Sequence, residues 1–357
     1  MKKYLLFFFA ACSSIFSRAQ YSPVTIPGSE IRTITSAIVN GQEYELHIML
    51  PGGYSSSHKK YPVVYVMDSQ WDFPLVKSIY GQQYYDGFIP ELIVVGVTWG
   101  GVKPNPDSLR VRDYTPTKEM NQPQSGGADQ FLQFMEKELF LFVEKNYNAS
   151  ADNRTLMGCS LGGLFTIYTF FTHTDMFSGY IAASPAIGWD KEVLYKYEKT
   201  FAAQSPTQTK KLYLTVGDVE TGRERFEVFS KFISNKKYNN AAIRYKVLEN
   251  TGHSGTKSET YNRGLQFAFE KPDLQLDDKA LHAFTGTYKT AQGRTAVIGM
   301  QDHRLVLYNG GSAPLPLKAA TVHTFYTDSF FLTIDFSEDG KTATAHQFGG
   351  SFVFQKN

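Results

Sequence analysis

The chain has 357 residues, of which 42% are hydrophobic and 20% charged, and its formal net charge is only +2. This balance is typical of a soluble globular protein and argues against a disordered or membrane-spanning one. The weak net charge supplies no basic field for nucleic acid, so no nucleic-acid partner is expected. The length predicts a sizeable core with a second, smaller domain appended.

Residues 1–19 predict an export signal. Two lysines precede an apolar run that is too short to span a membrane, and small and polar residues follow up to Ala19. We expect cleavage after Ala19, which predicts a periplasmic or secreted protein. The alternative is a lipoprotein acylated at Cys12. With Cys12 removed, Cys159 is the one remaining cysteine, so no internal disulfide is expected.

Strand and helix patterns alternate through the first two thirds of the chain. Two strands are expected within 31–50, where an Asn-Gly pair indicates a turn. Further strands are expected at 61–68, 91–99, 154–158, 179–185, 210–217 and 242–250, and helices at 127–147, 161–171, 223–233 and 257–269. This alternation predicts an α/β fold with a mostly parallel sheet and helices on both faces.

The pattern changes at Lys271-Pro272. A polar linker with a short helix is expected over 273–280, and short strands separated by turns follow to the end of the chain. The predicted organisation is therefore a signal (1–19), an α/β domain (20–271) and a small all-β barrel or sandwich (272–357). The β domain could bind a ligand, cover the catalytic pocket or form a dimer contact.

The candidate nucleophile is Ser160, in the Gly-x-Ser-x-Gly sequence that starts at Gly158. Such a match is weak alone, but here a strand precedes it and a helix follows, which is the context of the strained nucleophile turn of α/β-hydrolases. The neighbouring Cys159 is a rival nucleophile. Successive side chains of such a turn point in different directions, so we expect Cys159 to pack inward.

A serine hydroxyl needs a base, and this fold places serine, acid and histidine in that order along the chain. His253 follows a strand in a glycine-flanked loop, whereas His173 lies at the far end of the helix after the serine. Asp218 and Glu220 follow the preceding strand, and either could orient the imidazole. We favour Glu220 because it lies further past the strand end. Asp218 could instead cap the next helix.

An ester-cleaving serine also needs two backbone donors for the oxyanion. One donor is expected at Leu161, directly after the nucleophile at a helix N-terminus. The other is expected in the loop after the 61–68 strand, at Ser69, Gln70 or Trp71. Four aromatic residues are expected near the pocket: Trp71, Phe73, Trp99 and Trp189.

Residues of about 40–270 resemble the esterase family that includes enterochelin esterases, S-formylglutathione hydrolase, feruloyl and acetylxylan esterases and mycolyltransferases. The matching stretches are YPVVYVMDSQWDF, RDYTPT, GGADQFLQFMEKEL, RTLMGCSLGGLFTIY, FSGYIAASPAIGWD, LTVGDVE and TGHSG. The resemblance supports Ser160 and His253, favours Glu220 and selects Gln70 as the loop donor. RDYTPT and GGADQFLQF are most similar to the enterochelin-esterase-like branch, some members of which use a Ser-His dyad without the acid.

The sequence therefore predicts an exported serine esterase that acts through an acyl-enzyme on a siderophore ester. The alternatives are an esterase for feruloyl or acetyl groups on polysaccharide, and a non-catalytic binding protein on the same scaffold. No metal or organic cofactor is implied. The expected partner is a small-molecule or polysaccharide-linked ester, and the oligomeric state is open.

Overall fold

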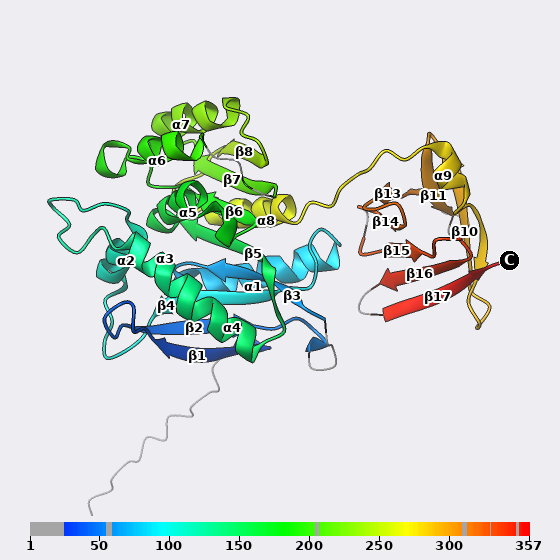
Figure 1. Ribbon diagram of the computed structural model, residues 1–357, viewed down its shortest axis with the longest axis horizontal. Helices are drawn as coiled ribbons and strands as arrows, with labels where there is room; N and C mark the ends of the chain where they lie inside the picture. Colours follow the sequence, from blue (N-terminus) through cyan, green and yellow to red (C-terminus); the bar gives the residue numbers. More distant parts are fainter. Residues whose placement is uncertain are drawn as a thin grey trace, which may run out of the picture.

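The computed structural model describes residues 25–54, 59–203, 206, 208–308, 313–328, 330–347 and 350–357. The export signal expected over 1–19 and Cys12 lie outside the described residues. Figure 1 shows a larger α/β part joined by an extended segment to a smaller β part.

The larger part is built on one twisted sheet, which has eight strands among the described residues in the order β1-β2-β4-β3-β5-β6-β7-β8. The first three strands in this order pair antiparallel, and β4, β3 and all later strands run parallel. The strands are β1 Ser29–Thr35, β2 Glu43–Met49, β3 Tyr61–Val66, β4 Ile93–Trp99, β5 Ala149–Cys159, β6 Gly179–Ala183, β7 Lys210–Gly217 and β8 Ala241–Leu248. The predicted α/β architecture is confirmed.

Helices cover both faces of this sheet. The helical elements are α1 Ser69–Tyr85, α2 Pro106–Tyr114, α3 Ala128–Phe134, η2 Met135–Leu139, α4 Phe140–Asn146, α5 Leu161–Thr172, η3 Thr174–Met176, η4 Trp189–Lys191, α6 Leu194–Phe201, α7 Arg223–Asn235 and α8 Thr256–Ala268. One core layer joins α1 and α8 to the sheet through Phe73, Val76, Tyr261 and Leu265. A larger, aromatic-rich layer under α2 to α7 fills the opposite face.

Three α-helices of the α/β part, α1, α2 and α6, were not predicted from the sequence. Pro74 and Gly81 interrupt the pattern of α1, and both residues disfavour helix interiors. The short α2 begins with Asn105, whose side chain accepts a hydrogen bond from the Ser108 N–H, and with Pro106. The helix predicted over 127–147 is present, but a π-helical turn divides it.

The smaller part is an all-antiparallel sheet, as predicted. Its nine strands among the described residues follow the order β12-β11-β10-β9-β17-β16-β15-β14-β13. The elements are α9 Asp278–His282, β9 Gly286–Lys289, β10 Thr295–Gln301, β11 Arg304–Tyr308, β12 Leu315–Pro316, β13 Lys318–Ala319, β14 Thr324–Tyr326, β15 Thr333–Phe336, β16 Thr342–Gln347 and β17 Gly350–Lys356. Only Leu317 separates the two edge strands β12 and β13, so the sheet curls back on itself as a barrel.

The β domain lies at the ends of α1 and α8 that are remote from the strand carboxyl ends (Figure 1). The Phe331 ring lies 5.3 Å from that of Tyr84, and Lys271 Nζ donates to the Gly87 carbonyl at 3.4 Å. Helix α1 has 17 residues, which corresponds to about 25 Å at 1.5 Å per residue. This position excludes the idea that the β domain covers the catalytic pocket. The boundary at 271/272 stays a prediction.

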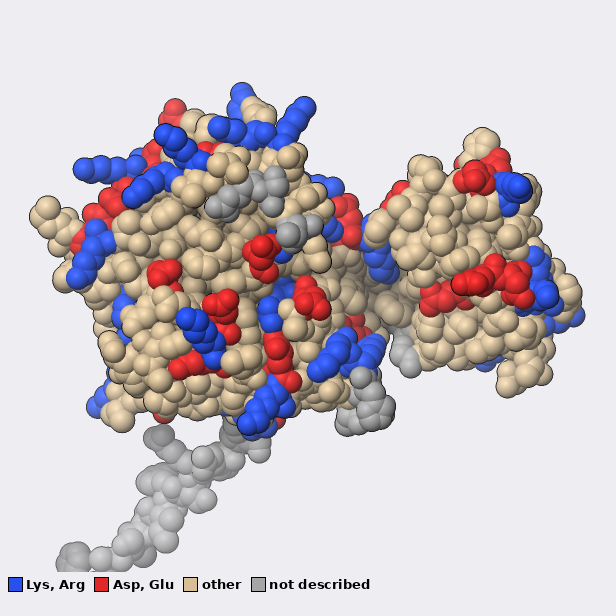
Figure 2. Space-filling view, in the orientation of Figure 1, with Lys and Arg blue, Asp and Glu red and all other residues tan. Residues whose placement is uncertain are grey.

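Charged side chains of both signs are interspersed over the face shown in Figure 2, which agrees with the small net charge. Within the described ranges, no helix has the length and apolar character needed to cross a membrane.

Candidate active site

Ser160 lies at the sharp turn between β5 and α5. Its backbone has φ 59° and ψ −115°, a conformation that costs energy for any residue with a side chain. The Ser160 N–H donates to the Ala183 carbonyl at 2.9 Å, which fixes the turn to the end of the neighbouring strand β6. The predicted strand–turn–helix context of this serine is therefore present.

Close backbone packing explains the glycines on either side of Ser160. A Cβ atom on Gly158 would lie 2.6 Å from the Gly162 carbonyl carbon, and one on Gly163 would lie 3.0 Å from Cα of Pro185. Side chains at these positions would force the turn open. The small residues thus allow the strand, the turn and the first turn of α5 to pack against one another.

Glu220 and His253 lie together at the ends of β7 and β8. The Glu220 Oε2 atom is 2.7 Å from His253 Nδ1, and its Oε1 accepts from the Gly217 N–H and from the Ser184 hydroxyl, each at 2.7 Å. Burial alone would raise the pKa of Glu220, but these hydrogen bonds outweigh it and hold the pKa below its ordinary value. Glu220 is therefore an ionised acceptor that orients the imidazole.

Asp218 has a different partner. Its Oδ1 atom accepts from the Thr251 N–H at 3.1 Å, so it anchors the start of the loop that carries His253. Backbone N–H groups of Asn250 and Thr251 lower the pKa of this carboxyl. The structure thus pairs His253 with Glu220 and not with Asp218.

Two hydroxyl residues that the sequence did not single out tie the acid to the histidine loop. The Ser184 hydroxyl bridges Glu220 Oε1 and Thr256 Oγ1, at 2.7 and 2.8 Å. Thr256 in turn donates to the His253 carbonyl at 2.8 Å. Ser184 directly follows strand β6, and this position at a strand end is the signal by which it could have been found.

The hydroxyl of Ser160 makes no hydrogen bond to His253 among the described residues. Catalytic hydrogen bonds are often long before substrate binds. Ser160 is linked to the Glu220–His253 pair through β6, because its N–H contacts Ala183 and the next residue, Ser184, contacts Glu220. All three predicted residues therefore lie at the carboxyl edge of the sheet.

The two expected oxyanion donors stand at adjacent helix N-termini. Leu161 begins α5, and Gln70 is the second residue of α1, so neither N–H has an acceptor within its own helix. Asp68 joins the two turns: its carboxylate lies 3.3 Å from the Cβ position of Gly162 and accepts from Arg110 at 2.8 and 3.0 Å. Arg110 was not expected as part of this region.

A second serine–histidine contact supports the start of α1. Ser69 Oγ lies 2.8 Å from His47 Nδ1, and His47 Nε2 lies 2.9 Å from Glu45 Oε1. Ser69 is fully buried against Gly96, where any Cβ would lie 1.9 Å from the Ser69 hydroxyl. This serine is therefore packed inside the fold, where it fixes the residue that precedes Gln70.

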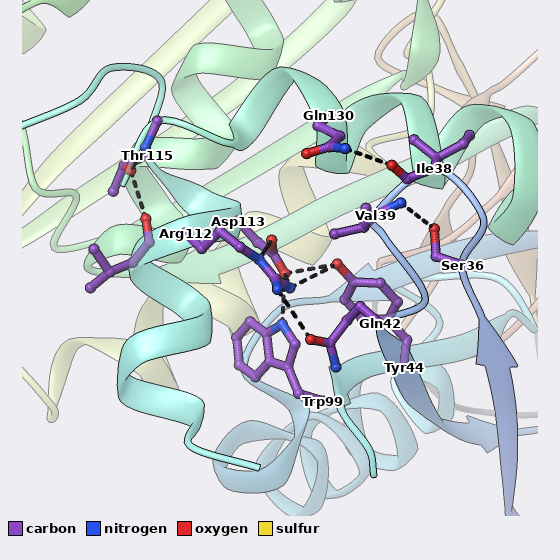
Figure 3. A network of polar contacts seen from close by, with 12 residues as sticks. Ser36, Ile38, Val39, Gln42, Tyr44, Trp99, Arg112, Asp113, Thr115 and Gln130 are labelled. Carbon is purple, nitrogen blue, oxygen red and sulfur yellow. Dashed lines mark hydrogen bonds and ion pairs between the residues drawn. The ribbon is translucent and has the colours of Figure 1, made fainter. Parts of the chain in front are cut away.

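The RDYTPT stretch forms a buried network that fastens α2 to the sheet (Figure 3). The Asp113 carboxylate accepts from Arg112 at 2.7 Å, from Tyr44 at 2.8 Å and from the indole of Trp99 at 2.7 Å. Thr115 Oγ1 accepts from the Gly126 N–H at 2.8 Å. This motif is structural, and it holds the helix from which Arg110 projects.

The four aromatic residues expected at the pocket separate into two groups. Phe73 and Trp99 are buried at 4% exposure, so neither offers a ring face to a substrate. Trp71 is 50% exposed beside Gln70, with the Arg110 guanidinium 5.8 Å from its ring centre. Trp189 is half-buried and donates to Thr117 Oγ1 at 3.2 Å.

Cys159 is buried at 3% exposure beside Met157 and Ile181. Burial raises the pKa of its thiol to about 12, so the thiolate is not populated near neutral pH. Within the described part of the chain, no group of three or more histidine, cysteine or acidic side chains could hold a metal ion.

The sheet order and the strained serine turn define the class of protein as an α/β-hydrolase. Residues 36–268 match the model of the family described as "Putative esterase", and the chain belongs to that family. It is an ester hydrolase of the enterochelin-esterase-like type.

Several relatives of this chain are named as siderophore esterases. The chain is 30% identical over 211 residues to the ferri-bacillibactin esterase BesA of Bacillus subtilis, a match that covers 55% of this chain and 72% of BesA. It is 27% identical over 176 residues to the apo-salmochelin esterase of Escherichia coli, covering 46% of this chain and 54% of that one.

Solved structures agree on the fold. The BES protein from Bacillus cereus superimposes with a TM-score of 0.63 at 25% identity, over 70% of this chain and 97% of that one. An IroE-like serine hydrolase from Shewanella oneidensis gives a TM-score of 0.61 at 22% identity, over 72% of this chain and 85% of that one.

Proposed function

We propose that this chain is an exported serine esterase that cleaves a siderophore ester through an acyl-enzyme. The observation that carries the mechanism is the 2.7 Å contact between Glu220 and His253 Nδ1, made beside the strained turn that presents Ser160. The names of the relatives support the substrate class.

The first half of the reaction follows from the orientation of the imidazole. Because Nδ1 of His253 is held by Glu220, Nε2 is the nitrogen free to take the Ser160 proton as the serine oxygen attacks the ester carbonyl carbon. The Leu161 and Gln70 N–H groups stabilise the resulting oxyanion. When the carbon–oxygen bond to the leaving alcohol breaks, the proton on Nε2 passes to that alcohol and leaves an acyl-serine.

The second half repeats these steps with water. His253 Nε2 takes a proton from a water molecule whose oxygen attacks the acyl carbon. The bond to Ser160 breaks, the proton returns to the serine oxygen, and the carboxylic acid product leaves. Each proton that His253 accepts is thus returned within the same half-reaction, and no redox partner is needed.

The side chains of Trp71 and Gln70 favour an aromatic substrate with polar groups. The half-exposed indole of Trp71 offers a ring face beside the oxyanion donors. The side-chain amide of Gln70 is buried, and neither of its polar atoms has a partner among the described residues. A buried amide without partners is costly unless a ligand or water completes it, so this group is a candidate for a polar contact with a bound molecule.

Hydrolysis of a panel of esters tests this proposal. The panel contains 4-nitrophenyl acetate, methyl ferulate, acetylated xylan and a cyclic catecholate trilactone siderophore with and without iron, each with wild type and Ser160→Ala. We expect serine-dependent cleavage of all reactive esters with the highest kcat/KM for the trilactone. A preference for methyl ferulate or xylan would replace the siderophore assignment. Ser160-independent turnover would contradict the mechanism.

For export, we propose removal of residues 1–19. The mass of the protein purified from its native envelope would place the new N-terminus at Gln20. A mass that retains Cys12 with an added diacylglycerol would contradict this cleavage and indicate a lipoprotein.

A further inference from the structure

The barrel of the C-terminal domain is packed at one end and hollow at the other. Phe284, Phe325 and Phe336 fill the packed end with mutual ring contacts of 4.7 to 5.6 Å. The other end holds a half-open cavity of about 260 Å³. It is lined by side chains of six strands and by the segment that leads into β15.

Small residues on β16 create this cavity. Ala345 pairs with Ile334 on one side and Phe352 on the other, and Ala343 pairs with Phe336 and Phe354. Alternate residues of these strands point into the barrel, so two methyl groups stand where larger side chains would fill the interior. Ala296 of β10 also lines the hollow end.

The size and lining of the cavity limit what could occupy it. A closed apolar cavity of about 150 Å³ accepts a benzene molecule. The present cavity holds one ring with a short chain of a few further atoms. The hydroxyl of Tyr288 is already committed to the carbonyls of Phe284 and Gly340, at 2.9 and 2.8 Å. The other uncharged polar residues of the lining are Thr295, Tyr308 and Gln347, and most of the remaining side chains are apolar, so the cavity favours a ligand with a large apolar part over a sugar.

Arg294 is the one charged residue among the described residues that line the cavity. Its guanidinium lies 5.3 Å from the ring centre of Phe352, which is itself part of the lining. In the described part of the chain this guanidinium has neither an ion pair nor a side-chain hydrogen bond. A cation without a counter-charge beside an apolar cavity is complementary to a ligand with one apolar end and one anionic end.

We propose that the C-terminal barrel binds a small monocarboxylate with a single ring, with the ring inside the cavity and the carboxylate on Arg294. This site is separate from the catalytic serine, because the β domain packs at the remote ends of α1 and α8. The proposal does not depend on the substrate assigned to the active site.

Calorimetric titration of the full chain with 3-phenylpropanoate tests the proposal, with 3-phenylpropan-1-ol as the neutral analogue. We expect saturable binding of the carboxylate, roughly tenfold or more tighter than binding of the alcohol, because an ionised acceptor strengthens the bond to Arg294. Arg294→Gln should lower the affinity for the carboxylate to that for the alcohol. Ala345→Phe should abolish binding of both. Equal affinities for the two compounds in wild type would overturn the charge assignment.

Two controls locate the binding. Protein covalently labelled at Ser160 with a fluorophosphonate should bind 3-phenylpropanoate as the unlabelled protein does, and loss of binding would place the ligand in the active site. In wild type carrying labelled alanine methyl groups, saturation should shift the resonances of Ala296, Ala343 and Ala345. Unchanged methyl resonances at saturation would overturn the proposal even if Ala345→Phe fails to fold.

Discussion

Glu220 Oε2 lies 2.7 Å from Nδ1 of His253, and the other oxygen of the same carboxylate is held by the Gly217 N–H and the Ser184 hydroxyl. The acid is therefore fixed through Oε1, which leaves Oε2 for the imidazole. A dyad without an acid would not need this arrangement, which favours the three-residue mechanism.

Glu220→Gln should lower kcat on the order of 10²–10⁴-fold, because the neutral amide no longer selects the productive imidazole tautomer. Asp218→Asn is the matched control, since Asp218 contacts Thr251 and not His253. The Asp218→Asn variant should retain activity within about threefold of wild type. Steady-state kinetics with 4-nitrophenyl acetate measures both variants, and comparable losses in the two would refute the distinction between the carboxylates.

The lowered pKa of Glu220 predicts a pH-dependent contribution to stability. A carboxyl whose pKa is lower in the folded state stabilises the fold above its unfolded pKa, and this contribution is lost as the pH falls through the folded pKa. Below about pH 4.5, the difference in melting temperature between wild type and Glu220→Gln should therefore shrink as the pH falls. A difference that grows as the pH falls below about 4.5 would contradict the lowered pKa of Glu220 in the folded protein.

His47 is expected to act as a positioning residue for the oxyanion donor Gln70. His47→Ala removes the partner of the Ser69 hydroxyl, and kcat should fall about tenfold with KM little changed, less than the 10²–10³-fold cost of deleting a donor. His47→Asn, which can accept the same hydrogen bond, should recover part of the loss. His173→Ala, at the far end of α5, is the control. A change in KM alone would contradict this role.

Gly217 must be glycine because a Cβ there would lie 1.9 Å from the Thr251 carbonyl oxygen. Gly217→Ala should cost about 1–3 kcal/mol of stability and displace the loop that carries His253. Gly81, in the middle of α1, has nothing within 4 Å of its Cβ position. Gly81→Ala should therefore stabilise the protein by about 0.5–1 kcal/mol. Thermal melts compare the two, and an unaffected melting temperature in Gly217→Ala would contradict the packing.

Cys159 should be inert toward thiol reagents. Its burial and raised pKa leave almost no thiolate at pH 8. In a Cys12→Ser variant, Ellman's reagent should detect no thiol in the native protein and one after unfolding. Rapid reaction of the native protein would show that the serine turn opens.

The sequence predicted the scaffold and the order of the site residues because both depend on local patterns. Buried strands are continuous apolar runs, and the serine turn has a short signature. The pairing of His253 with Glu220 rather than Asp218 could be favoured but not decided, because it depends on how two loops from separate strands meet.

Several features of the structure could not be predicted from the sequence, for physical reasons. Pro74 and Gly81 hide the pattern of α1, and only tertiary packing makes that segment helical. Trp99 was expected at the pocket, but its indole is used to satisfy the buried Asp113. Which alanines face inward at the hollow end of the barrel depends on how the strands pair. The sequence alone does not show that pairing.

Peptide mapping by mass spectrometry after fluorophosphonate treatment tests the central claim most directly. We predict that the label is found on Ser160, that it is absent in Ser160→Ala, and that His253→Ala slows labelling by on the order of 10²-fold or more. An unlabelled Ser160 in folded protein, or labelling at the same rate without His253, would contradict the proposal that this site is a serine esterase.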